Sequence, residues 1–139
     1  MADTGLLFSH CFDESEIEKQ NLYKQIITGK LSINKGMLYE NVVSQMLVAQ
    51  NKKLYFYTNY NKEKKRNDIE IDFLITDNNI NKKLIPIEVK SSKKYSMVSI
   101  NRFYEKYKSR IDHIIIVSPK EFEVENEVMK LPPYMVWCI

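Results

Sequence analysis

The chain has only two cysteines, and no apolar run approaches the roughly 18 residues that a membrane-spanning helix needs. Cys11 and Cys138 are too few to form a disulfide framework, which favours a reducing compartment. The opening residues, MADTGLLFSHCF, lack the basic region and the clean apolar stretch of a signal peptide. We therefore expect a cytoplasmic protein that does not associate with membranes.

Three common signatures of catalytic or metal sites are also missing. Gly29 and Lys30 lack both the leading glycine and the following Ser or Thr of a phosphate-binding loop, so this segment alone should not bind ATP in that manner. The sequence has no G-x-S-x-G element, which the nucleophile elbow of a hydrolase requires. His10 and His113 have no metal-ligand spacing. Any catalytic or metal-binding residues must therefore be sought among other side chains.

The composition that is present indicates a folded domain. Of the 139 residues, 44% are hydrophobic and 12% are aromatic, which suits one compact domain with a substantial core. The chain contains neither an internal repeat nor a linker. We predict a single domain over 1–139, with a helical lead-in at 1–33.

The net charge is only +3, but the positive charge is clustered in two short runs, at 62–66 and 90–94. Such runs can hold the phosphate backbone of a nucleic acid, although more often they are solvated loops. We expect DNA as a partner. The predicted contacts with it come from Lys64, Lys65, Arg66, Lys93 and Lys94.

Hydrophobic periodicity predicts a mixed α/β domain with the element order ααβββαβ. The predicted helices cover about 13–29, 35–50 and 97–109, and the predicted strands cover 53–59, 68–76, 83–90 and 113–118. The acidic stretch at 121–130 is interpreted as a solvated edge, and the tail PPYMVWCI is a candidate for a last short strand.

Strand alternation brings several charged residues together. Asp68, Glu70 and Asp72 share one face of their predicted strand, while Ile69, Ile71 and Phe73 share the other. Glu88 and Lys90 share a face of the next strand. If these strands are neighbours, Asp72 and Glu88 converge at one end of the sheet, with Lys90 beside them. The flanking residues are strongly apolar, and acids are rarely buried without a partner.

Two carboxylates at close range repel each other, and a divalent cation relieves that repulsion. Ligands that are all oxygen favour Mg²⁺ or Mn²⁺. Glu40 lies at the border of the apolar stripe of the 35–50 helix and could point at the same metal. Two alternatives remain open. Glu40 could simply interact with the helix macrodipole, and Glu88 and Lys90 could form an ion pair at a solvated edge.

These four residues resemble the motif of the PD-(D/E)XK nuclease superfamily. The motif consists of Glu40 in LYENVV, Asp72 in EIDFLI, and Glu88 with Lys90 in IEVKSS. With DTGLL and the proline-led tail, nearly the whole chain resembles an uncharacterised C-terminal domain that follows an AAA-type ATPase module in bacterial and archaeal proteins. The resemblance implies that an ATPase domain precedes DTGLL in the full-length chain, so the sequence is interpreted as an excised C-terminal part.

The resemblance further implies a restriction-endonuclease-like fold, in which helices flank a mixed β-sheet. One or two Mg²⁺ or Mn²⁺ ions would bind Asp72 and Glu88 with help from Glu40, and Lys90 would orient the attacking water during hydrolysis of DNA. The alternative is a catalytically silent module that binds nucleic acid or protein and regulates the attached ATPase.

Overall fold

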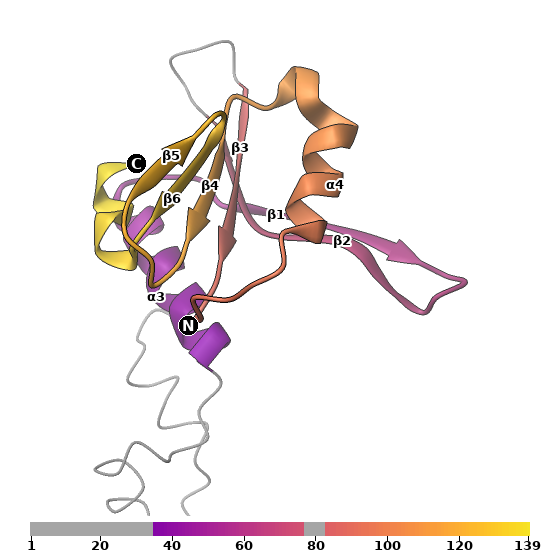
Figure 1. Cartoon of the computed structure of the whole chain (residues 1–139), viewed down its shortest axis with the longest axis horizontal. Coiled ribbons are helices and arrows are strands. Elements are labelled where there is room, and N and C mark those ends of the chain that lie inside the picture. The colour runs from indigo at the N-terminus through magenta and orange to yellow at the C-terminus, as the bar shows by residue number, and fades with distance from the viewer. Residues whose placement is uncertain (1–34, 77–82) are drawn as a thin grey trace, which may run out of the picture.

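A computed structural model describes residues 35–76 and 83–139 of the chain (Figure 1). They form an α/β fold built on one mixed sheet of six strands. The elements in chain order are α3 (Lys35–Ala49), β1 (Tyr55–Asn61), β2 (Arg66–Thr76), β3 (Leu84–Val89), α4 (Val98–Tyr107), the short 3₁₀ helix η1 (Lys108–Arg110), β4 (Ile114–Val117), β5 (Glu123–Glu125), β6 (Val128–Leu131) and the 3₁₀ helix η2 (Pro133–Cys138).

The strands lie in the order β1-β2-β3-β4-β6-β5. Antiparallel pairs form both outer parts of the sheet, whereas β3 pairs with β4 and β4 with β6 in parallel. A parallel pair needs a crossover connection, and α4 supplies it between β3 and β4. All four residues of β4 are buried, as expected for a strand that is covered on both faces.

Two apolar clusters cover the two faces of the sheet. On one face, Val43 and Leu47 of α3 pack with Val136 of η2 and with alternate residues of β3 and β4. On the other face, Ile100 and Phe103 of α4 pack against β2 and β4. The helical spacing predicted for 35–50 and 97–109 is confirmed, because each helix buries its apolar side against the sheet.

A bulge in β2 interrupts its alternation. Tyr55 pairs with Leu74 and Tyr57 pairs with Ile71, so β2 holds one extra residue between these positions. Ile71 therefore packs on the α4 side, while Phe73 packs on the α3 side. The expectation that these two side chains share a face was wrong, because the bulge shifts the later residues by one.

The predicted order ααβββαβ was wrong at the C-terminal end, where the described elements run αβββαβββ. The acidic stretch forms the hairpin β5–β6, whose turn contains Asn126 at a φ of 54°. Lys130 Nζ donates to a carboxylate oxygen of both Glu123 and Glu125, at 3.0 Å each, which offsets their repulsion. The tail is η2 instead of a strand, with Pro133 at its first position.

The predicted helix at 13–29 and the lead-in at 1–33 lie outside the described residues. Within 35–76 and 83–139, none of the helices is long and apolar enough to cross a membrane.

Candidate functional site

The candidate site lies where β2 and β3 separate. Their ladder runs from the pair Thr76 and Leu84 to the pair Phe73 and Ile87. Beyond that point β2 continues with β1 as a hairpin that projects from the body of the molecule, while β3 stays paired with β4 (Figure 1). A cleft of about 460 Å³ opens beside the separated strands, lined by residues of β2, the end of β3 and the beginning of α4.

Asp72 stands at the point of separation. Its Oδ2 accepts the backbone N–H of Val89 at 2.7 Å, so the side chain bonds a group of β3 that lies beyond the last ladder pair. Burial raises the pKa of Asp72, and the charge of Glu70 raises it further. The Val89 N–H and the Lys90 ammonium oppose this shift by stabilising the carboxylate.

Glu88 is the most deeply buried acid of the site, with 5% of its surface exposed. Its Oε1 accepts a hydrogen bond from Lys90 Nζ at 2.5 Å. Its Oε2 is buried and has no hydrogen-bond partner among the described residues. Burial, and after it the negative charge of Asp72, raises the pKa of Glu88 to about 7, although Lys90 acts in the opposite direction.

Glu40 is electrostatically linked to this group from α3. Burial and then the charge of Asp72 raise its pKa, whereas Lys90 lowers it. Glu40 is the sixth residue of α3, beyond the first turn where the macrodipole acts most strongly. The macrodipole alternative is thereby weakened. Glu40 does not line the cleft as Asp72, Glu88 and Lys90 do.

Glu70 is a further acid of the site that was not predicted from the sequence. Glu70 lines the cleft, and its charge raises the pKa of Glu40, Asp72 and Glu88. Its Oε2 accepts a hydrogen bond from Asn67 Nδ2 at 3.2 Å. The strict alternation of DIEID was the signal that could have placed Glu70 there, because it shares a face with the acids around it.

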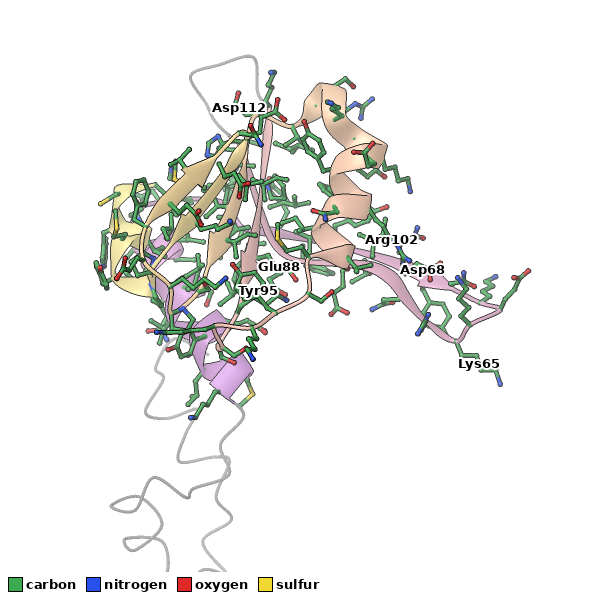
Figure 2. The ribbon with its side chains drawn as sticks, viewed as in Figure 1. Lys65, Asp68, Glu88, Tyr95, Arg102 and Asp112 are labelled. Carbon is green, nitrogen blue, oxygen red and sulfur yellow. The ribbon has the colours of Figure 1, made fainter. Side chains whose placement is uncertain are left out.

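The wall opposite Glu70 comes from α4. This contribution of α4 to the site was also not predicted from the sequence. Ser99 Oγ accepts the backbone N–H of Glu70 at 2.9 Å, and Arg102 Nη1 donates to the carbonyl oxygen of Asp68 at 3.2 Å. These bonds attach the start of α4 to the part of β2 that is not paired with β3. Figure 2 shows Arg102 reaching from α4 toward Asp68 on β2.

The five basic residues predicted to contact DNA do not converge in this cleft. Lys65 lies at the tip of the β1–β2 hairpin, far from Glu88 (Figure 2). Lys64 forms an ion pair with Asp68 at 3.6 Å. Lys93 and Lys94 are exposed in the loop after β3. Arg66 alone among the five lines the cleft.

The donor set is compatible with a hard divalent cation. In the described ranges, no three His, Cys, Asp or Glu side chains already form a metal-binding cluster. However, Glu88 is buried and Asp72 is half-buried, their carboxylates repel each other, and Glu88 Oε2 has a free lone pair. Oxygen donors of this kind suit Mg²⁺ or Mn²⁺.

Comparison with known proteins gives a family for this chain. The model of the family described as "Domain of unknown function (DUF4143)" matches residues 35–134, so the chain belongs to the DUF4143 family. No curated protein and no solved structure matches the chain. The matched range contains every residue of the candidate site.

Proposed function

We propose that this domain is a divalent-metal-dependent nuclease of the PD-(D/E)XK type, which hydrolyses phosphodiester bonds of DNA. The observation that carries the proposal is the buried Glu88 carboxylate. Its Oε2 has no hydrogen-bond partner among the described residues, and the negative charge of Asp72 repels it. A buried charge without compensation is unfavourable, and a bound cation would supply that compensation.

Each residue of the site has a distinct proposed role. Asp72 is held by the Val89 N–H, which fixes one oxygen and leaves the other for a metal ion. Glu88 would offer Oε2, while its Oε1 orients the Lys90 ammonium. Lys90 would then donate to the attacking water or to a phosphate oxygen. Glu40 would assist by adding negative charge near Asp72.

When bound, Mg²⁺ or Mn²⁺ would polarise the phosphodiester and lower the pKa of a coordinated water. The low cysteine count supports a cytoplasmic location. The family resemblance suggests that the domain is attached to an AAA-type ATPase domain of the same full-length chain. That domain would regulate the cleavage or apply force to the DNA.

A catalytically silent module is the second candidate, and one contact favours it. The ion pair between Lys90 Nζ and Glu88 Oε1, at 2.5 Å, compensates both charges in part without any metal. In this alternative the cleft binds nucleic acid or a protein partner and tunes the ATPase.

A cleavage assay separates the two functions. Supercoiled, linear, single-stranded and branched DNA would be incubated with the protein in Mn²⁺, in Mg²⁺ and in EDTA. We expect cutting that requires metal and is lost in Asp72→Ala/Lys90→Ala. The matched control is Lys83→Ala/Asp112→Ala, which removes another Lys–Asp pair, at 3.9 Å, near the start of β3.

The control variant should cut like the wild type. Figure 2 shows Asp112 at the other end of β3 from Glu88, away from the cleft. If the wild type cuts none of these substrates, the nuclease proposal is contradicted and the silent module is favoured.

A further inference from the structure

The cleft has a second end that the acidic motif does not use. Along β2 its lining changes from the acids Asp72, Glu70 and Asp68 to Arg66, and on the facing wall α4 contributes Arg102. Ser96 and Ser99 lie on the same wall as Arg102. The cleft therefore has a carboxylate end at the point where β2 and β3 separate, and an arginine end toward the tip of the β1–β2 hairpin, where Arg66 pairs with Asn61.

Both arginines retain donors for a ligand. The side chain of Arg66 has no hydrogen-bond or ion-pair partner within the described ranges, although it lines the cleft. Arg102 uses Nη1 to bond the carbonyl oxygen of Asp68, and a guanidinium carries five N–H donors. A planar fork with several free donors matches the oxygens of a phosphate group.

The negative charges near the arginine end are largely compensated. Asp68 Oδ2 accepts from Asn61 Nδ2 at 2.6 Å, and Asp68 Oδ1 lies 3.6 Å from Lys64 Nζ. These groups lower the pKa of Asp68, with the Asn61 hydrogen bond as the main cause. Asp68 is therefore engaged mainly with Asn61 and Lys64 of the hairpin, and the charge of Arg102 makes a smaller contribution to its lowered pKa.

The start of α4, on the facing wall, also contributes positive potential to this end of the cleft. The first turn of α4 consists of the uncharged residues Val98, Ser99 and Ile100. Its positive macrodipole end is therefore not opposed by an acid within the turn. Arg66, Arg102 and the start of α4 thus contribute positive potential to one end of a single cleft.

We propose that the arginine end is a phosphate subsite, which holds the backbone of a nucleic-acid strand while a phosphodiester about six nucleotides further along that strand reaches the acidic end. This inference rests on the proposed function, because it assigns the substrate strand a path along β2. Arg66 precedes Asp72 by six residues, or about 20 Å in an extended strand. That length corresponds to about six stacked nucleotides.

The test measures binding without metal, so that it does not depend on cleavage. A fluorescent single-stranded oligonucleotide would be titrated with the full chain in EDTA over a series of salt concentrations. We expect Arg66→Gln and Arg102→Gln each to weaken binding about tenfold, as the loss of a charge-assisted hydrogen bond predicts. Each variant should also lower the salt slope by about 0.7.

Arg110→Gln is the matched control, since Arg110 is an exposed arginine of η1 that does not line the cleft. It should bind like the wild type. Because Arg102 also bonds a backbone carbonyl, its substitution could disturb the fold. Arg66→Gln therefore serves as the second variant, since the Arg66 side chain makes no hydrogen bond or ion pair within the described part. If both cleft variants bind as Arg110→Gln does, the subsite is refuted.

The outcome is independent of the fate of the nuclease proposal. Weaker binding by the two cleft variants, together with no cleavage by the wild type, would support the subsite and overturn the nuclease. Unchanged binding by the variants, together with metal-dependent cleavage, would overturn the subsite and leave the nuclease intact.

Discussion

At the scale of single residues, burial of the Glu88 carboxylate is energetically unfavourable, and this cost is consistent with the proposed role of Glu88 in binding a metal ion. A carboxylate with 5% of its surface exposed is unfavourable when charged, and Asp72 increases that cost. Lys90 compensates only one of its two oxygens. The charged carboxylate therefore does not stabilise the fold, and this agrees with its proposed role as a ligand of a divalent metal ion.

The raised pKa of Glu88, about 7 against 4.5, predicts how stability depends on pH. Between about pH 4.5 and pH 7 the folded state keeps a proton that the unfolded chain has lost, so stability falls as pH rises through this window. Glu88→Gln cannot lose that proton. Its stability relative to the wild type should therefore rise from pH 5 to pH 8, by about 3 kcal/mol at most.

Urea unfolding at the two pH values measures this difference. The matched control is Glu105→Gln, which changes an exposed glutamate of α4 and should follow the pH dependence of the wild type. A stability difference between Glu88→Gln and the wild type that stays constant from pH 5 to pH 8 would contradict the assignment.

At the scale of elements, α4 determines whether the cleft has a second wall. Phe103 anchors the helix with 1% of its surface exposed, and its ring lies 5.0 Å from that of Tyr57 and 4.9 Å from that of Tyr107 between centroids. The bonds from Ser99 and Arg102 to β2 then fix the start of the helix at the cleft. Packing and site geometry are thus coupled through one short helix.

Phe103→Ala should lower the free energy of unfolding by about 3–5 kcal/mol, because it removes a buried aromatic ring and leaves a cavity. Chemical denaturation measures the loss. Asn101→Ala, at an exposed position of the same helix, should change stability by less than about 0.5 kcal/mol. Equal effects of the two substitutions would show that α4 does not depend on Phe103 for its attachment.

Local patterns were sufficient to predict the first part of the sheet and much of the site. Alternation and spacing placed Asp72, Glu88 and Lys90 on adjacent strands, and these three residues do line one cleft. The bulge in β2 was not predictable, because it depends on pairing with β1. Arg102 was missed for a similar reason, since its position depends on how α4 crosses from β3 to β4.

The C-terminal elements were missed because their signals are weak or misleading. The strands β5 and β6 are short. The interpretation of the acidic stretch as a solvated edge agrees with the exposed edge position of β5, but the alternating acids did not indicate a hairpin in which Lys130 pairs with Glu123 and Glu125. The apolar tail resembles a strand, but Pro133 begins a 3₁₀ helix that packs on α3.

At the scale of the whole molecule, the sheet separates two tasks. The buried centre, with β3 and β4, holds the fold together, while β2 leaves that centre and carries charged residues away from it. The modest net charge of +3 conceals this arrangement, because an acidic end and a basic end share one cleft. The distribution of charge, rather than its total, is what favours a phosphodiester substrate.

The most direct test of the central claim is a calorimetric titration with Mn²⁺ of the wild type, Asp72→Asn, Glu88→Gln and the control Asp112→Asn. We expect saturable binding by the wild type and by Asp112→Asn, and its loss in the two site variants. If the wild type shows no saturable binding, or if Asp72→Asn and Glu88→Gln bind Mn²⁺ as the wild type does, the cleft is not a metal site and the proposed mechanism is wrong.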